Sequence, residues 1–542
     1  MMAIFASLLI SLFLTVILTP VFNRLAKRLD MYDVPGPRKV HQLPVPRVGG
    51  LAMAIGAFVS IVIWTPLDSM IRAYLMGAMI LVVFGIVDDW KGLGFKAKFI
   101  AQIITALTAI FYGNIRIVNL GALLPNGVIL ADWISALLTL VVIVGVTNAI
   151  NLSDGLDGLA GGICMLSFCC IGYLSYLERD FNIVIPIAAL VGAIIGFLRF
   201  NTFPATLFMG DTGSQLLGFS AIYFSLALTQ GQSGLSPLLP LIILGFPVLD
   251  TLSVMGERIA KGRSPFSADK NHFHHRLMRM GLFHTESVFC IYIIQVVLVL
   301  SAFALRYNNE WMLLVSYLIF ATIVVAFFHW ADATGWKFRR FSFIDQIVKG
   351  RLRVLREQGL FIMIIFWTLE WGVPLLLVVT CFLPAAIPLY FSVSAAVLLV
   401  GLLLTRIFKK DWTKGAVIVS LYLFIPALIY QSDTEAWIQG PLMRLYHLLF
   451  VIFVLFAIAT LRFTKRMKGF KLTPTDLLVL FITSILLILP ELRLQYGLMV
   501  VKTIMLFFLY EIILGEIRDK IGTVAVLTVA AYLIVVIRGL TG

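Results

Sequence analysis

The chain of 542 residues is 61% hydrophobic and only 13% charged. A soluble protein of this length would need more charged residues to cover its surface, so the composition indicates a polytopic membrane protein and excludes an ordinary soluble enzyme. Lys and Arg (42) outnumber Asp and Glu (28), a balance typical of basic cytoplasmic loops. We therefore expect these basic residues to contact membrane lipids, and we expect no nucleic acid partner.

The first part of the chain predicts an all-α bundle with about 11 transmembrane helices, because its apolar segments are long enough to cross a bilayer. They cover residues 3–22, 48–65, 71–87, 98–112, 130–148, 159–177, 182–199, 213–229, 236–255, 284–304 and 310–328. The first segment has no basic region before it and no cleavage site, so we expect it to be retained as a span.

Lys and Arg collect in alternate loops, which predicts the orientation of the bundle. The loop after the first span is strongly basic, as are the loop 256–283 and the segment 337–356. The loops between them, such as 113–129 and 230–235, are short or poor in basic residues. We therefore expect the basic loops, and the polar motifs they contain, to face the cytoplasm.

Three regions follow from this pattern. Residues 1–335 form the first membrane domain, 336–358 a basic juxtamembrane linker suited to anionic lipid, and 359–542 an additional membrane region. The last region predicts about seven further helices. These lie at roughly 359–380, 385–405, 414–431, 441–461, 474–490, 496–514 and 521–538. Its function stays open; a scaffold that docks a partner is one interpretation.

The most polar stretch between two spans is 145–159. It contains Asn148, Asn151, Asp154 and Asp157, each three residues from the next. If the stretch is helical, this spacing puts the four side chains on neighbouring turns of a slowly rotating face. Carboxylates crowded at a membrane boundary repel one another unless a cation lies among them. The alternative is a solvated loop in which the acids cap helices.

Two more acidic motifs border predicted spans. Asp88 and Asp89 end the third span, and Asp211 lies between Gly210 and Gly213 just before another. Adjacent carboxylates bind a divalent cation, or one of them acts as a base. The glycines would let backbone amides approach a phosphate. An ordinary helix boundary at the first motif and a helix cap at the second are the alternatives.

Two basic motifs complement the acidic ones. One follows the ninth span and contains His272, His274, His275 and Arg276; the other is the first loop, with Lys39 and Arg47 among Pro and Gly. Both suit a phosphate-rich anion. Zinc is the rival interpretation of the histidines, but the neighbouring Arg and Lys would oppose it. Together, the acidic and basic loops indicate Mg²⁺-assisted chemistry on a phosphate or diphosphate, with one substrate arriving from the lipid.

Five ordered motifs carry a specific resemblance. They are PRVGG (46–50), FGIVDDWKGL (84–93), NAINLSDGLDGLAGG (148–162), FMGDTGS (208–214) and HFHHRL (272–277). The set resembles the polyprenyl-phosphate N-acetylhexosamine-1-phosphate transferases, most of all their WecA/TagO branch, with the MraY branch more distantly related. The resemblance covers about residues 1–330 and none of the carboxyl-terminal third.

The resemblance implies an enzyme that transfers N-acetylhexosamine-1-phosphate, with GlcNAc-1-phosphate expected, from a UDP-sugar to undecaprenyl phosphate. The reaction releases UMP and initiates cell-surface glycan synthesis at the cytoplasmic face of a bacterial inner membrane. Mg²⁺ is the implied cofactor, with Mn²⁺ as the alternative ion. Analogy with related enzymes suggests a homodimer.

The family's roles carry over motif by motif. The resemblance places the metal at Asp211 and Asn151. It assigns catalysis to Asp88, Asp89, Asp154 and Asp157, with one residue of the first pair as the base for the lipid phosphate. It assigns substrate binding to Asn148, Asn151, His272, His274, His275, Arg276, Lys39 and Arg47. It leaves single and double displacement both open.

Other interpretations remain at this stage. The donor could carry a FucNAc or QuiNAc type sugar. The MraY branch transfers phospho-MurNAc-pentapeptide, but it has consecutive histidines, whereas Phe273 interrupts them here. A membrane transporter or flippase would place ionisable residues near span centres, whereas these acids lie at span ends on one face.

Overall fold

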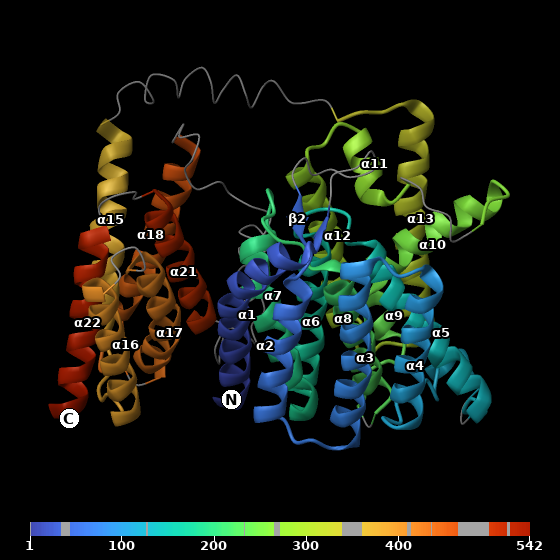
Figure 1. Ribbon diagram of the computed structural model, residues 1–542, viewed down its shortest axis with the longest axis horizontal. Helices are drawn as coiled ribbons and strands as arrows, with labels where there is room; N and C mark the ends of the chain where they lie inside the picture. The colour runs from blue at the N-terminus through green and yellow to red at the C-terminus, as the bar shows by residue number, and fades with distance from the viewer. Residues whose placement is uncertain are drawn as a thin grey trace. The chain divides into compact units, whose positions relative to one another are not determined.

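The computed structural model confirms an all-α membrane protein (Figure 1). Ten helices in the described part of the chain are long and apolar enough to cross a bilayer. The structure describes residues 2–33, 44–125, 128–231, 233–264, 271–338, 360–408, 413–434, 436–438, 440–463, 498–516 and 521–541. The helices group into two compact units, one within Met1–Arg339 and one within the remaining chain.

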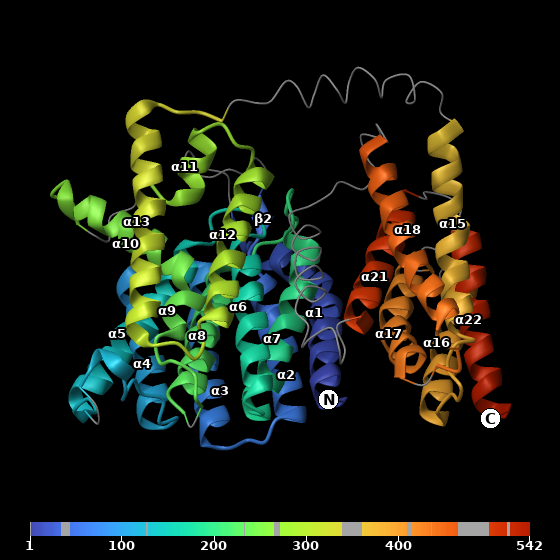
Figure 2. The same ribbon diagram turned by 180° about the vertical axis from the view of Figure 1, so that it is seen from behind.

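The first unit is a bundle in which successive long helices run in alternate directions (Figures 1 and 2). Its helices are α1 (Met2–Leu29), α2 (Gly49–Trp64), α3 (Ser69–Lys91), α4 (Phe95–Phe111), α5 (Asp132–Leu152), α6 (Leu159–Leu177), α7 (Phe181–Asn201), α8 (Gly210–Thr229), α9 (Leu239–Ile243), α10 (Gly245–Ala260), α11 (Phe273–Arg279), α12 (His284–Ala304) and α13 (Glu310–Thr334). A 3₁₀ turn covers Gly121–Leu123, and β1 (Tyr32–Asp33) pairs antiparallel with β2 (Val45–Pro46). The alternation brings the polar motifs to one end of the bundle.

Local signals in the sequence set where these helices begin and end. Asp68 caps α3 by accepting a hydrogen bond from the amide of Ile71 at 2.8 Å, and Asn309 caps α13 in the same way. Gly92 and Gly335 end the same two helices in the left-handed conformation that glycine adopts without strain. The long helices therefore have defined ends, and the acidic pair at the end of α3 has a fixed position.

Helix α8 is the centre of the first unit. Every residue from Thr212 to Leu226 is buried, and the helix packs against α2, α3, α5 and α6. Small residues allow the close approach: a Cβ on Gly85 would lie 2.5 Å from the Cα of Thr212, and one on Gly218 would lie 2.9 Å from the Cα of Thr147. Small residues at helix contacts are typical of membrane bundles.

One predicted span differs from the structure. The apolar segment 236–255 is not a single helix but breaks at Leu244 into α9 and α10. Pro247 explains the break, because its ring nitrogen cannot donate the hydrogen bond of a continuous helix and would clash with the carbonyl of Ile243. Helix α10 packs against α5 and α12 and projects from the bundle in both views (Figures 1 and 2).

The second unit is also a helical bundle. It contains α15 (Leu360–Thr380), α16 (Leu389–Phe408), α17 (Thr413–Thr434), α18 (Pro441–Phe463), α21 (Leu498–Glu516) and α22 (Ile521–Thr541). Lys502 of α21 is buried and pairs with Asp433 of α17, with Nζ and Oδ1 2.5 Å apart. The predicted span 474–490 and nearly all of the predicted linker 336–358 lie outside the described residues.

The contact between α2 and α8 generates a first prediction. A Cβ on Gly50 would lie 2.2 Å from the backbone nitrogen of Gly213, so Gly50→Ala must push two backbones apart. We expect it to destabilise the protein by about 1–3 kcal/mol, seen as a lower thermal unfolding temperature in detergent. The control is Gly145→Ala on α5, where nothing lies within 4 Å and alanine should be neutral or stabilising by up to about 1 kcal/mol. Equal unfolding temperatures for the two variants would contradict this packing.

Candidate active site

The site begins with Asp89, whose carboxylate caps the amino terminus of α8. It accepts hydrogen bonds from the amides of Asp211 (2.9 Å) and Thr212 (3.1 Å) and from the Thr212 hydroxyl (2.7 Å). Gly210 has a φ of +68°, and a Cβ there would lie 2.4 Å from Asp89 Oδ2. The carboxylate therefore joins the end of α3 to the start of α8, where the helix dipole favours a negative charge.

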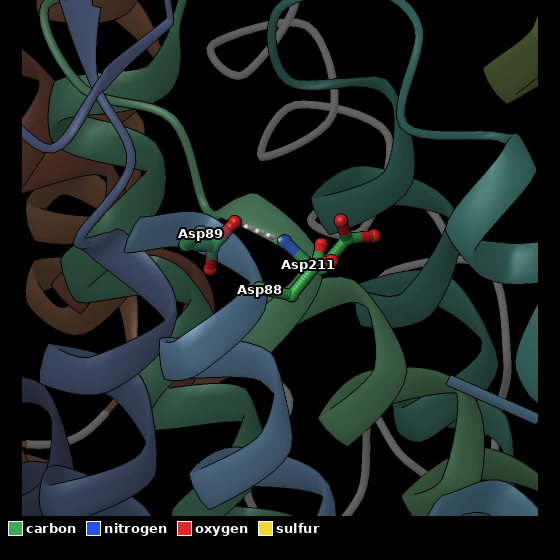
Figure 3. A group of neighbouring side chains, drawn as sticks. All are labelled: Asp88, Asp89 and Asp211. Atoms are coloured by element: carbon green, nitrogen blue, oxygen red, sulfur yellow. Dashed lines mark hydrogen bonds between the residues drawn. The ribbon is translucent and has the colours of Figure 1, made fainter. Parts of the chain in front are cut away.

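Asp88 and Asp211 lie beside this cap (Figure 3). Asp88, Asp89 and Asp211 each offer a carboxylate oxygen, and these oxygens all lie within 4.8 Å of one another. Lys98 of α4 partly offsets the crowding, since its Nζ lies 2.8 Å from both Asp88 Oδ2 and Asp211 Oδ2. Sequence reasoning did not select Lys98, which begins the predicted span 98–112. The one feature of the sequence that could have indicated its role is its position soon after the acidic pair.

The amide-rich motif meets the same carboxylates. Asn151 at the end of α5 donates hydrogen bonds to Asp211 Oδ1 and to Ser214 Oγ, the second at 2.7 Å. Asn148 lies three residues earlier on α5 and is half-buried. The spacing of three thus places the two amides on one side of α5, as the sequence predicts for a helical stretch.

The loop between α5 and α6 separates the roles of Asp154 and Asp157. Asp157 Oδ2 accepts a hydrogen bond from the amide of Ala205 (2.9 Å), and the Asp157 amide donates to His284 Nε2 (3.1 Å). Asn201 accepts a further bond from the Gly158 amide (2.9 Å). Asp157 therefore ties the loop to its neighbours, and its predicted part in catalysis stays a prediction.

Asp154 of the same loop has a perturbed ionisation. Burial raises its pKa to about 7, and the negative charges of Asp211, Asp89 and Asp157 add to the shift, while Arg47 opposes it. The side chain keeps some exposed surface although protein atoms surround it. The negative charge of an ionised Asp154 is thus unfavourable until a cation or a cationic group comes close.

The first loop packs onto the FMGDTGS motif through backbone hydrogen bonds. The amides of Gly49 and Gly50 donate to the carbonyls of Phe208 and Met209, each at 2.9 Å, and the amide of Phe208 donates to the carbonyl of Pro46. Arg47, which follows β2, pairs with Asp33 of β1. Lys39, the other basic residue predicted here, lies outside the described residues.

The histidine motif lies against the acidic loop. A Cβ on Gly155 would lie 2.4 Å from His274 Nε2, so the two segments are in contact. His274 is 3% exposed, and its Nε2 has no hydrogen-bond partner among the described residues. Burial, reinforced by His275, His272 and His284, lowers its pKa well below 6.5, so the ring is neutral.

Arg276 and His272 have fixed partners. The buried Arg276 pairs with Glu257 of α10 and with Asp332 of α13 (3.3 Å), and its Nε donates to the Asn271 carbonyl. It therefore ties α10, α11 and α13 together. His272 Nδ1 lies 2.9 Å from Asp250 Oδ2. Sequence reasoning did not select Asp250, because it lies inside an apolar segment.

These contacts bring together side chains from three of the five motifs at the carboxylate cluster. The first loop packs onto the FMGDTGS motif, and the histidine motif contacts the acidic loop. Hard oxygen ligands from three carboxylates suit Mg²⁺, and the amine already held between two of the carboxylates shows that the cluster accepts a positive charge. A membrane bundle with such a cluster beside a histidine loop defines a class of protein that handles phosphate groups at a membrane boundary.

Comparison with known proteins agrees. A family model described as "Glycosyl transferase family 4" matches residues 71–229. The chain is 36% identical to a "Probable undecaprenyl-phosphate N-acetylglucosaminyl 1-phosphate transferase" of Bacillus subtilis (strain 168) over 64% of this chain and 98% of the relative. It is 32% identical to an "Undecaprenyl-phosphate alpha-N-acetylglucosaminyl 1-phosphate transferase" of Escherichia coli (strain K12) over 65% of this chain and 96% of the relative. The chain therefore belongs to glycosyl transferase family 4, together with these transferases, which confirms the resemblance.

The raised pKa of Asp154 generates a second prediction. The folded protein holds a proton there up to about pH 7, whereas the unfolded chain loses it near pH 4, so the contribution of this group to stability is lost as the pH rises from about 4 to 7. In detergent with EDTA, we expect the unfolding temperature to decrease as the pH rises over this range. Asp154→Asn should make this decrease smaller. The control is Asp132→Asn, whose carboxylate is 99% exposed. Parallel pH curves for wild type and Asp154→Asn would contradict the assignment.

Proposed function

We propose that this protein transfers N-acetylglucosamine-1-phosphate from UDP-GlcNAc to undecaprenyl phosphate, releasing UMP and forming the lipid-linked sugar that starts a cell-surface glycan. The names of the Bacillus subtilis and Escherichia coli relatives support the transferred N-acetylglucosaminyl 1-phosphate group and the undecaprenyl phosphate acceptor. The carboxylate cluster of Asp88, Asp89 and Asp211 carries the proposal, because it lies at the end of a membrane bundle where a lipid phosphate and a nucleotide sugar can meet.

Asp211 and Asn151 would hold Mg²⁺, with Mn²⁺ as the alternative ion. The amide nitrogen of Asn151 donates to Asp211 in this structure, so the amide would turn to offer its oxygen to the ion. When bound, the ion would offset the negative charge of the diphosphate. Asp89 would act mainly through structure, since its carboxylate already accepts hydrogen bonds from the start of α8. Lys98 would stay near the diphosphate as a second positive charge.

The transfer itself is a displacement at phosphorus. An oxygen of the lipid phosphate forms a bond to the β-phosphorus of UDP-GlcNAc, and the bond from that phosphorus to the bridging oxygen breaks, so the electron pair leaves with UMP. We assign Asp88 as the base that takes the proton of a monoprotonated lipid phosphate, because its Oδ2 faces Lys98 and Asp211 at the centre of the cluster. Single displacement is the simpler course, since it needs no covalent aspartyl intermediate.

The histidine motif would bind the nucleotide diphosphate, and Arg47 near Asp154 would add a positive charge at the edge of the site. Arg276 would stabilise this loop and not contact substrate, because two carboxylates already hold its guanidinium. The positive-inside pattern supports a site on the cytoplasmic side of a bacterial inner membrane. A homodimer stays a prediction from analogy.

The central prediction concerns UMP release by the full chain in detergent, with undecaprenyl phosphate, Mg²⁺ and a panel of UDP-sugars. We expect UDP-GlcNAc to give UMP and a lipid-linked product. Asp211→Asn and Asp88→Asn should each lower kcat by about 10²–10³-fold, because each removes a carboxylate from the developing charge.

The matched control is Asp68→Asn, the same exchange at the opposite end of α3, where asparagine can still cap the helix. It should retain wild-type activity within a few fold. A different active donor, such as a UDP-FucNAc or UDP-QuiNAc type sugar, would change the substrate and keep the reaction class. Wild-type activity in Asp211→Asn would contradict the proposed site.

A fourth prediction concerns the second unit. The Bacillus subtilis relative is covered over 98% of its length by 64% of this chain, so its alignment leaves about a third of this chain without a counterpart. The contacts of the site described above all lie within the first unit. We therefore expect a chain that ends near residue 345 to fold in detergent and to release UMP at a rate within about threefold of the full chain. Loss of activity in a truncated chain that still unfolds cooperatively would assign the second unit a part in catalysis.

A further inference from the structure

We propose that Asp250 is a positioning residue for the transfer: it fixes the tautomer and orientation of His272, so that Nε2 of this ring is presented to the diphosphate of the nucleotide sugar. The inference rests on the proposed function and adds to it a residue from α10, outside the five sequence motifs.

Asp250 uses both of its carboxylate oxygens to hold His272 and the residue that follows it. Asp250 Oδ2 lies 2.9 Å from His272 Nδ1, and Asp250 Oδ1 accepts a hydrogen bond from the amide of Phe273 at 2.7 Å. Both side chains are almost fully buried, with 2% of Asp250 and 6% of His272 exposed. One carboxylate therefore fixes both the imidazole of His272 and the backbone at the first residue of α11.

The tautomer follows from the chemistry of the partner. A carboxylate only accepts hydrogen bonds, so Nδ1 of His272 must carry its proton, which leaves Nε2 on the far edge of the ring. His272 makes no hydrogen bond through Nε2 within the described part of the chain. The ring stacks on His274, with centroids 5.9 Å apart and planes at 11°. Because His274 contacts Gly155 of the acidic loop, this stack places His272 beside the proposed site.

The two histidines have different environments. His274 is surrounded by other histidines and has no carboxylate partner among the described residues, and its pKa is lowered. The carboxylate of Asp250 accepts the Nδ1 proton of His272, so Nε2 is the atom that would take a second proton, and a ring protonated there can donate to a phosphate oxygen. Asp250 thus gives His272 a carboxylate partner that His274 lacks within the described part of the chain.

The break between α9 and α10 explains how Asp250 reaches this ring. Helix α10 starts anew at Gly245, and its buried face includes Phe246, Leu249, Asp250 and Val254. Phe246 contacts Phe273 with ring centroids 5.8 Å apart, which holds α10 and α11 together one turn from the carboxylate. If α9 continued as one straight helix, Asp250 would lie within an apolar span. An unpaired carboxylate there would cost free energy.

The first test measures the tautomer without turnover. Full-length protein labelled with ¹⁵N-histidine is studied by solid-state NMR in lipid, with His272→Asn used to assign the His272 signals. We expect wild-type His272 to carry its proton on Nδ1 when neutral, and Asp250→Asn to move the proton to Nε2, because the amide can donate to Nδ1. A wild-type signal with the proton on Nε2 would overturn the inference.

The second test is a double-variant cycle on the binding of UDP, measured by calorimetry on the full chain in detergent. Asp250→Asn keeps an acceptor for the Phe273 amide and changes only the partner of His272. His272→Asn places an amide near Nδ1 and removes Nε2. We expect each variant to weaken UDP binding by about tenfold or more, and the Asp250→Asn change to have no further effect in the His272→Asn background.

The outcomes separate the two proposals. If the variants weaken binding independently, so that their effects multiply, Asp250 acts through the fold and the positioning role is wrong. If Asp250→Asn binds UDP as wild type does, the role is also wrong. Asp68→Asn should leave the affinity unchanged, and unfolding temperatures of the variants identify any loss of fold. If wild-type protein neither binds UDP nor releases UMP, the proposed function fails, and with it the presentation of Nε2 to a diphosphate.

Discussion

The structure depends on one contact above all, the carboxylate of Asp89 on the amino terminus of α8. A buried acid at this position needs strong donors, and it finds two backbone amides and a hydroxyl. Because Asp89 ends α3 and Asp211 begins α8, the same contact forces Asp88 and Asp211 close together. The electrostatic cost of that proximity creates the need for a cation, which Lys98 meets in part.

Glycines make the convergence of the motifs sterically possible. Gly50 and Gly85 let α2 and α3 approach the start of α8 at distances where a side chain would meet backbone atoms, and Gly155 gives His274 room against the acidic loop. The motif glycines are therefore packing positions around a centre of charged groups. Chemistry and packing are coupled here, because the residues that hold the carboxylates together also hold the helices together.

Much of this could be predicted from the sequence, and the failures have physical reasons. Hydropathy predicted the membrane class, helices lie at most of the predicted spans that the structure describes, and the acidic and histidine motifs do meet at one end of the first unit. The break at Leu244 was missed because hydropathy does not register Pro247. Lys98 and Asp250 were missed because their roles come from tertiary contacts: each meets carboxylates or a ring distant in sequence. The fixed partners of Asp157 and Arg276 were equally invisible to a pattern of residue types.

The most direct test of the central claim is the position of the metal ion. Crystals of the full chain grown with Mn²⁺ and a non-hydrolysable UDP-GlcNAc analogue would give an anomalous signal that locates the ion without assumptions. We predict one peak between Asp88 and Asp211, within reach of Asn151, with the amine of Lys98 moved away from at least one of the two carboxylates. A peak elsewhere, or Lys98 still bridging both carboxylates in the presence of bound nucleotide, would contradict the account.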